Sequence, residues 1–181
     1  MEINPGPRRP VSDVCIILCS NVRCLARSLS DLTVSSSQYD ILLCFETLVS
    51  DMRHVLELLV PGSGRPVLLW RARCLGRGMA TYVQDGYGAL RQPKFECGCY
   101  EMLVLRVCGV RQNIYLFSLY HNSDPDDQIF DCLLASMTAV QASFLFVGDL
   151  NGQHQEWLGS MTTNHHGVAA FDFATVSSCD Q

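Results

Sequence analysis

Short apolar runs that end at a polar side chain recur along this 181-residue chain. Runs of about four to eight such residues predict strands that are buried on both faces. We therefore expect strands at residues 14–20, 40–46, 66–70, 78–83, 113–120 and 143–149, with one or two more within 95–107. In the run NIYLFSLY both alternating sets of positions are apolar, which predicts that this strand is covered on both sides.

Apolar residues at helical spacing lie between several of these strands. Leu25, Leu29 and Leu32 share one face of a helix predicted over residues 25–36. A second helix is predicted over residues 51–60, with Ser50 as its N-terminal cap and Pro61 at its end. Two further helices are predicted over residues 125–141 and 167–178.

The last of these helices has Val168, Phe171 and Thr175 at helical spacing. The order of elements is strand, helix, strand, helix, several strands, helix, strand, helix. It predicts a mixed α/β (α+β) domain in which helices cover sheets. The length fits one domain, residues 13–181, preceded by a flexible, proline-rich lead-in at residues 1–12.

No apolar run reaches the ~18 residues that a membrane helix needs. Residues 132–147 come nearest and are interrupted by Ser, Thr and Gln. The first ten residues, MEINPGPRRP, do not read as a signal peptide, and the apolar stretch after them is short. We therefore expect no membrane partner and an intracellular location, nuclear or cytoplasmic.

Ten cysteines lie mostly within apolar runs such as VCIILC and ILLCF, where a thiol packs as a small hydrophobe. In an intracellular protein they are expected to be reduced. Cys97 and Cys99 lack the two-residue gap of zinc knuckles, and no second pair lies at a matching distance. Core packing is therefore favoured over metal binding at this pair.

Charge is distributed unevenly. All 13 Lys and Arg lie at or before Arg111, whereas residues 112–181 hold eight acidic residues, so the two parts carry +3 and −8. A net-acidic chain is a poor general binder of nucleic acid, because phosphate contacts need cations, but a bound metal ion can supply positive charge locally. The Arg-rich section from Arg65 to Arg91 could contact a nucleic-acid backbone, or its arginines could simply be solvated.

Polar side chains stand at the ends of four predicted strands: Asn21, Glu46, Tyr120 and Asp149. Loops at one rim of a sheet commonly carry ligand sites. Asn151 follows Asp149 by two positions, so both side chains point to the same side of an extended chain. Taken singly, each residue also has a structural explanation, as a solvated acid, a turn signal or a core tyrosine with a hydrated hydroxyl group.

Four motifs in order, SNVRCL, LLCFET, SLYHN and VGDLNGQHQEW, resemble the endonuclease/exonuclease/phosphatase superfamily, which has the deoxyribonuclease-like fold. The likeness is to the endonuclease domain of non-LTR retrotransposons of the jockey or LINE type, and it covers about residues 12–181. The resemblance implies a layered β-sandwich flanked by helices. It further implies hydrolysis of DNA phosphodiesters with a divalent metal, and a reverse transcriptase domain in the parent polyprotein.

The resemblance also implies a role for each strand-end residue. Glu46 matches the metal-binding acid, and Asn21 matches the amide beside it, which contacts metal or phosphate. Asp149 matches the residue that orients or activates the attacking water, Asn151 the amide that holds a phosphate oxygen, and Tyr120 the active-site tyrosine. These residue types suit Mg²⁺ (or Mn²⁺), since a hard ion takes one or two carboxylates and keeps several waters.

The sequence also departs from the family pattern. The family completes its site with a later Asp and a Ser-Asp-His segment, whereas this sequence ends at Cys179-Asp180-Gln181. We therefore expect the C-terminal strands and the acid/base histidine to be missing. Cys24 stands where a glycine is expected, and HNSD where Arg-Asn-Pro is expected. The leading hypothesis is an incomplete retrotransposon endonuclease domain with little or no activity.

Two alternatives stay open. One is an inactive fragment that only binds nucleic acid or a partner protein. The other is an abasic-site nuclease or a phosphatase relative, because the same strand-end residues serve both. His154, His165 and His166 are predicted to be surface residues, with the last two in a polar turn, and Trp157 is predicted to pack over the site loop.

Overall fold

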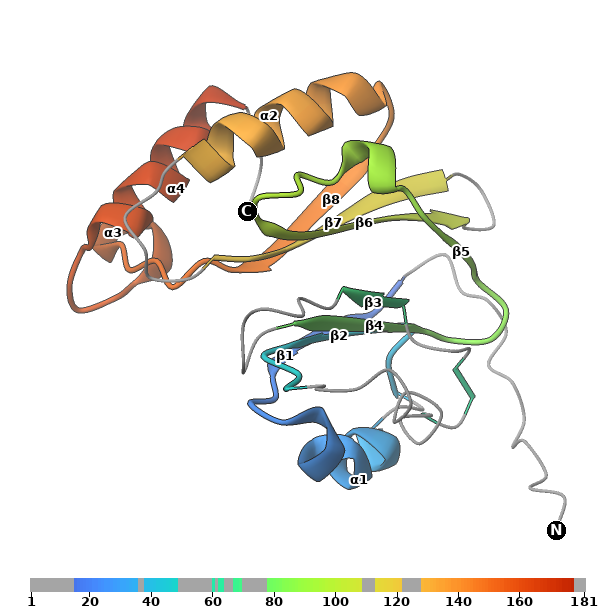
Figure 1. Cartoon of the computed structure of the whole chain (residues 1–181). Coiled ribbons are helices and arrows are strands. Elements are labelled where there is room, and N and C mark those ends of the chain that lie inside the picture. Colours follow the sequence, from blue (N-terminus) through green and yellow to red (C-terminus); the bar gives the residue numbers. More distant parts are fainter. Residues whose placement is uncertain are drawn as a thin grey trace, which may run out of the picture. The chain divides into compact units, whose positions relative to one another are not determined.

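The computed structural model describes residues 15–35, 38–48, 60, 62–63, 67–69, 78–108, 113–121 and 128–177. These residues form two four-stranded mixed sheets flanked by helices, which is the α+β class that the sequence predicts (Figure 1). The chain divides into two compact units. The first unit comprises Met1–Arg91 and Leu105–Ile114, and the second comprises Gln92–Val104 and Tyr115–Gln181.

The first sheet has the strand order β1-β2-β4-β3. β1 runs parallel to β2, whereas β4 runs antiparallel to both β2 and β3. Every residue of β2 and β4 is buried, as their apolar runs predict. The strands are β1 (Ile17–Asn21), β2 (Ile41–Phe45), β3 (Val67–Leu69) and β4 (Met79–Val83).

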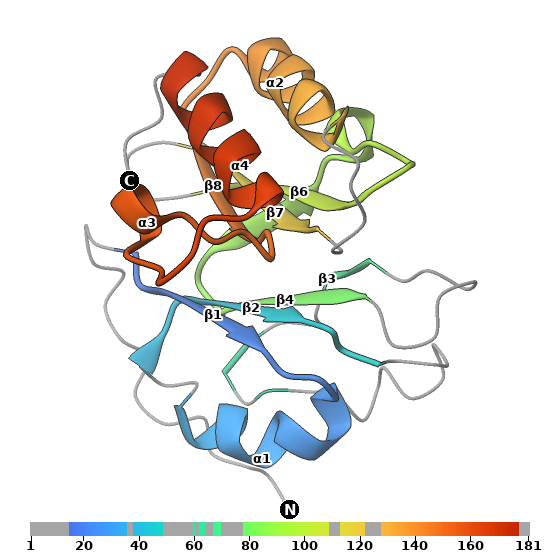
Figure 2. The same cartoon turned by 90° about the vertical axis from the view of Figure 1, so that its left-hand side faces the viewer.

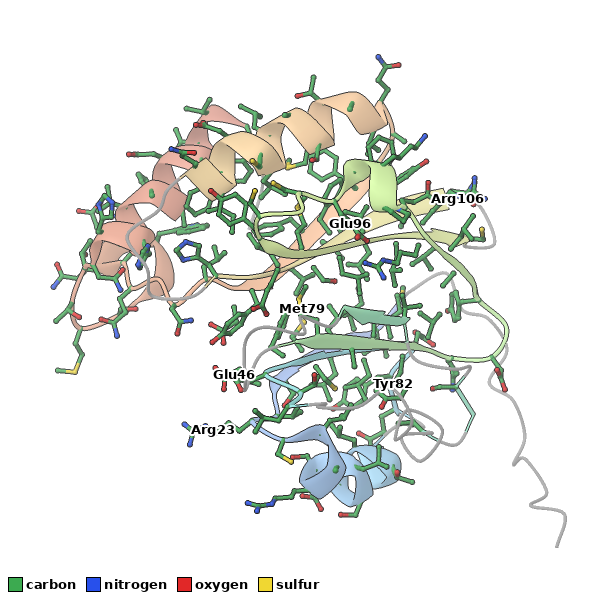
Figure 3. The ribbon with its side chains drawn as sticks, viewed as in Figure 1. Arg23, Glu46, Met79, Tyr82, Glu96 and Arg106 are labelled. Carbon is green, nitrogen blue, oxygen red and sulfur yellow. The ribbon has the colours of Figure 1, made fainter. Side chains whose placement is uncertain are left out.

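Helix α1 (Leu25–Ser35) lies along one face of this sheet (Figures 1 and 2). Leu25 and Leu32 are buried in the cluster between helix and sheet, and Leu29 packs against it, so the predicted apolar face is confirmed. Tyr82 of β4 points toward the helix (Figure 3). Burial, followed by the nearby Cys44 thiol, raises the pKa of the Tyr82 hydroxyl well above its usual value.

The second sheet has the strand order β5-β6-β7-β8. β5 and β6 pair antiparallel, whereas β7 and β8 pair parallel. The last five residues of β7 are buried, in line with the predicted double burial of NIYLFSLY. The strands are β5 (Gly88–Arg91), β6 (Glu101–Cys108), β7 (Asn113–Tyr120) and β8 (Phe144–Asp149).

Helices α2 (Gln128–Val140) and α4 (His165–Val176) lie side by side over one face of the β6-β7-β8 part of this sheet (Figures 1 and 2). The rings of Phe130 and Phe173 meet between the two helices with centroids 5.4 Å apart. Phe117 and Leu119 of β7 and Leu133 of α2 are fully buried in the same apolar cluster. This cluster is the core of the second unit, and it fixes α4 against the sheet.

The structure corrects four expectations about the elements. Residues 93–95 form a short 3₁₀ helix, η3 (Pro93–Phe95), and 96–100 form an irregular segment with a turn at 98–99 rather than a strand. The short strand β5 is not predicted from the sequence. β1 and β8 are only partly buried, because each is the last strand on its side of the sheet among the strands that the structure describes. Phe144 and Leu145 of β8 are 37% and 42% exposed.

The fourth correction concerns α4, which begins at His165, so His165 and His166 form its first turn instead of a polar turn before it. His166, Ala170 and Phe173 are buried, whereas Val168, the first residue of the predicted helical spacing, is 42% exposed. The helix predicted over 51–60, with its Ser50 cap, lies outside the described residues apart from Val60. In the Arg65–Arg91 section, residues 65–66 and 70–77 lie outside them, and these include four of its five arginines. None of the described helices is long and apolar enough to cross a membrane.

Candidate active site

Asn21 and Glu46 lie next to each other at one end of the first sheet. Asn21 pairs in register with Phe45 across the parallel strands β1 and β2, and Glu46 is the residue that follows Phe45. Because parallel strands end at the same edge of a sheet, the two side chains stand on adjacent strand ends. The Val22 amide donates a 3.0 Å hydrogen bond to the Phe45 carbonyl, which continues the pairing past the last residues of the strands.

Two loop residues here adopt left-handed backbone conformations. Glu46 has φ 55° and Arg23 has φ 51°, in a region that non-glycine residues seldom visit and that is enriched at functional sites. The Arg23 amide donates a 3.3 Å hydrogen bond to Oδ1 of Asn21, which turns the chain just after β1. Figure 3 shows the Arg23 and Glu46 side chains leaving the same end of this unit.

Arg23 is therefore a charged neighbour that the sequence analysis did not single out. The signal for it is its position two residues after a strand-end amide, within the SNVRCL motif. Its side chain is exposed, so the guanidinium group is available to an anion. Glu46 is half-buried, and together with the Asn21 amide it supplies hard oxygen donors of the kind that bind Mg²⁺.

Tyr120, Asp149 and Asn151 lie together in the second unit. Tyr120 pairs in register with Asp149 across the parallel strands β7 and β8, so both stand at the same end of that sheet. The amide of His121 donates a 2.9 Å hydrogen bond to the Asp149 carbonyl. The Asn151 side-chain amide in turn donates a 2.7 Å hydrogen bond to the His121 carbonyl. The two strand ends are thus joined through backbone groups.

The loop after Asp149 is folded back on itself. The Asn151 amide donates to Oδ1 of Asp149 at 3.2 Å, and Asn151 has φ 48°. This Asx-type turn fixes the direction of the Asp149 carboxylate relative to the Asn151 side chain. Asp149 is half-buried and Asn151 is exposed. β8 ends at Asp149, so the two residues are brought together by this turn and not by the extended chain that the sequence predicts.

Asn164, at the N-terminal cap of α4, holds this loop in place. Its Oδ1 accepts hydrogen bonds from the amides of Gln153 at 2.9 Å and Gly167 at 2.8 Å. Its Nδ2 donates to the Asn151 carbonyl at 3.0 Å, and its own amide donates to the Gln153 carbonyl at 2.9 Å. One side chain therefore caps the helix and fastens the loop that carries Asp149 and Asn151.

Two glycines allow the close approach of loop and helix. A Cβ atom at Gly167 would lie 1.9 Å from the Gln153 carbonyl oxygen, and one at Gly152 would lie 3.3 Å from the Gly167 backbone. Neither Asn164 nor Gly167 has a role predicted from the sequence. The only sequence signal for such a role is an asparagine just before a helix, and it is weak because the helix predicted over 167–178 begins two residues later than α4 does.

The histidines take different positions. His166 and His121 are buried, 8% and 4% exposed, with ring centroids 4.6 Å apart, so the expectation that His166 is a surface residue is wrong. His165 is exposed. His154 caps α3 (Gln155–Leu158) by accepting from the Trp157 amide, and its ring stacks on Phe171 at 4.7 Å. Trp157 packs edge-on against Phe171.

The predicted site residues thus form two groups, Asn21 with Glu46 in the first unit and Tyr120 with Asp149 and Asn151 in the second. Within the part of the chain that the structure describes, no cluster of three or more His, Cys, Asp or Glu is arranged to hold a metal ion. The oxygen donors at hand are the Glu46 carboxylate and the Asn21 amide. This set fits a hard cation that keeps most of its waters better than a zinc site, which needs His or Cys ligands.

No family model and no curated protein matches the sequence. The endonuclease domain of TRAS1, a telomere-specific non-LTR retrotransposon, has a similar structure with a TM-score of 0.68 at 17% identity, over 90% of this chain and 70% of that one. The AP endonuclease LMAP from Leishmania major gives a TM-score of 0.61 at 17% identity, over 95% of this chain and 71% of that one.

TDP2 from Caenorhabditis elegans gives a TM-score of 0.52 at 14% identity over 77% of this chain, which spans about half (48%) of that protein. At these identities the likeness establishes the fold. The chain has the endonuclease/exonuclease/phosphatase fold, as its four motifs predict.

Proposed function

We propose that this chain is a divalent-metal-dependent phosphodiester hydrolase, the DNA-nicking endonuclease domain of a retrotransposon. The observation that supports it most is the placement of the strand-end residues. In each unit a parallel strand pair, β1 with β2 and β7 with β8, brings together the residues that the family motifs assign to catalysis. If these residues were only solvated acids or turn residues, nothing would require them to lie at the paired ends of two parallel strand pairs.

In this proposal Glu46 and Asn21 hold Mg²⁺ (or Mn²⁺) through a carboxylate and an amide oxygen. The bound ion would offset phosphate charge and lower the pKa of a bound water. The Arg23 main chain orients the Asn21 side chain, and the exposed Arg23 guanidinium would contact a DNA phosphate. The left-handed backbone at Glu46 supports a functional role, because strained backbone conformations cluster at functional sites.

Asp149 would orient and deprotonate the attacking water, Asn151 would hold a phosphate oxygen, and Tyr120 would line the site. Asn151 uses one N–H of its side-chain amide on the His121 carbonyl. A primary amide has two N–H donors, so the second is the one assigned to phosphate.

DNA is the proposed substrate because the similar structures include a retrotransposon endonuclease domain and a TDP2 from D. rerio in complex with a single-strand DNA product. By the same reasoning we propose that the chain acts inside the cell, beside a reverse transcriptase domain. Residues 112–181 carry eight acids and no Lys or Arg, so in this proposal the metal ion and arginines before residue 112, Arg23 among them, supply the positive charge near the phosphate.

The test is nicking of supercoiled plasmid at enzyme excess with Mg²⁺ or Mn²⁺, because we expect slow turnover. Nicking should stop with EDTA and in Glu46→Gln and Asp149→Asn. Asp172→Asn removes an exposed acid from α4 and is the matched control. Binding of Mn²⁺, followed by electron paramagnetic resonance, should be lost in Glu46→Gln and kept in Asp172→Asn. If Glu46→Gln changes neither Mn²⁺ binding nor nicking, the proposal is refuted.

A second candidate is cleavage at abasic sites, which the likeness to an AP endonuclease favours. A duplex with one tetrahydrofuran abasic analogue, compared with an intact duplex, distinguishes the two. Cleavage confined to the abasic duplex would favour this candidate, whereas equal nicking of both would favour the retrotransposon type.

A further inference from the structure

We propose that Cys97 and Cys132 are a thiol modification site, which reacts with a small-molecule disulfide such as oxidised glutathione to form a reversible intramolecular disulfide. This inference is independent of the nuclease proposal. It concerns the second unit alone, because both cysteines lie there.

The geometry that supports it is a direct sulfur–sulfur contact. The Sγ atoms of Cys97 and Cys132 are 3.3 Å apart and share a hydrogen bond, although the residues are 35 positions apart in sequence. A disulfide bond is about 2.05 Å long, so the two atoms need to approach by roughly 1 Å, which side-chain rotation can supply. Both side chains are half-buried, which leaves access for a small reagent.

The two cysteines are held by different elements. Cys97 follows η3, and its carbonyl accepts a hydrogen bond from the Tyr100 amide, which closes the turn. Cys132 lies in α2, where its carbonyl accepts a bond from the Ser136 hydroxyl. The Cys97 side chain also packs against the core of the second unit. The contact is therefore set by two separately anchored backbones.

The chemistry balances with glutathione disulfide as the oxidant. The Cys97 sulfur attacks one sulfur of the reagent, which releases one glutathione thiol and leaves a mixed disulfide. The Cys132 sulfur then attacks Cys97 and releases the second glutathione. Two protein thiols are oxidised, one glutathione disulfide is reduced, and the two thiol protons end on the two glutathiones.

The order of attack follows from the state of Cys132. Its hydrogen bond with Cys97, followed by burial, raises the pKa of the Cys132 thiol to about 11. Cys132 is therefore protonated at neutral pH, and the first exchange falls to Cys97. Once Cys97 carries glutathione, that hydrogen bond is gone, so the main cause of the raised pKa is removed and Cys132 can act as the resolving thiol.

The exposed Cys99 lies two residues from Cys97 and is the natural competitor. The experiment equilibrates the folded protein with oxidised and reduced glutathione, blocks free thiols with N-ethylmaleimide and maps the peptides without reductant. We expect one dominant link between Cys97 and Cys132, a mass lower by two hydrogens, and reversal by dithiothreitol. The link should persist in Cys99→Ser and in the control Cys108→Ser, and should be lost in Cys97→Ser and Cys132→Ser.

Two further readouts separate a native site from random oxidation. In concentrated guanidinium chloride the same treatment should scatter the links over many cysteines. The oxidised folded protein should melt higher by roughly ten degrees, because the bond closes a long loop. A link through Cys99, a stable glutathione adduct on Cys97 that Cys132 does not resolve, or no enrichment over the denatured protein would each overturn the proposal.

Discussion

Replacing Gly167 with alanine tests whether α4 positions the loop that carries Asp149. An exposed glycine in a helix normally gains about 1 kcal/mol of stability on replacement by alanine, because alanine is the better helix former. Here the added Cβ would lie 1.9 Å from the carbonyl oxygen of Gln153, 2.4 Å from the carbonyl carbon of Gln153 and 2.9 Å from the backbone nitrogen of Gln153. Backbone atoms cannot rotate away, so helix and loop must separate by about 1 Å.

The expected magnitude follows from this forced movement. Overpacking of a close backbone contact costs about 1–3 kcal/mol, which reverses the sign of the usual glycine-to-alanine effect. The Gln153 carbonyl also accepts the Asn164 amide, so the same movement weakens the cap. A displacement of about 1 Å at a catalytic group can lower the rate about 100-fold, and kcat/KM of any nicking activity should fall to that extent.

The assay combines urea unfolding with amide hydrogen exchange at Gln153 and Asn164. Gly167→Ala should unfold at lower urea, and both amides should exchange faster than in the parent protein. Gly98→Ala is the matched control, because a Cβ at Gly98 meets no atom within 4 Å. A Gly167→Ala protein that is as stable as the parent or more so, with unchanged exchange at Gln153, would refute the reasoning.

Three other changes have definite expected outcomes. Asn164→Asp keeps the two hydrogen bonds that the side-chain oxygen accepts, and with them the helix cap, but loses the hydrogen bond donated to the Asn151 carbonyl. Asn164→Ala loses all three side-chain hydrogen bonds. Hydrogen exchange of the Gln153 amide should therefore be faster in the Ala variant and close to the parent value in the Asp variant. Leu133→Ala in the core of the second unit should lower the free energy of unfolding by about 3–5 kcal/mol, measured by urea denaturation, and the exposed Leu134→Ala should change it far less. Burial, followed by the nearby Cys19, raises the pKa of the Cys44 thiol from the ordinary value of 9.0 to about 12 in the folded chain. The contribution of the buried, protonated Cys44 thiol to folding stability is therefore fully present below about pH 9 and is lost as the pH rises toward 12. Cys44→Ala should flatten that alkaline loss of stability, and an unchanged slope between pH 8 and pH 11 would contradict this explanation.

Those elements that have a continuous apolar run or a helical period were predictable from sequence. β2, β7, α1 and α2 follow from local patterns that the tertiary structure reinforces. β5 was missed because GALR has no apolar run and gains its strand conformation from pairing with β6. The burial of β1 and β8 was overestimated because an apolar run does not reveal whether its strand lies at the edge of a sheet.

The site was predictable only as far as motifs and strand ends show it. The pairings of Asn21 with the end of β2 and of Tyr120 with Asp149 follow from parallel strands, whose register no local pattern encodes. His166 was assigned to the surface because its burial depends on the ring of His121, 45 positions earlier in the chain. Asn164 has no predicted role for a similar reason, since two of its partners, Gln153 and Asn151, lie 11 and 13 positions earlier in the loop that precedes α3.

The position of β8 at the margin of its sheet has a practical consequence for work with this protein. Among the described strands it has a neighbour on one side only, and its first residues, Phe144 and Leu145, are exposed. A strand of this kind, with no charge before Asp149, is a template onto which another polypeptide can add by main-chain hydrogen bonding. Concentrated samples should therefore begin to associate along β8, and a lysine at position 145 is the conservative way to keep them monomeric.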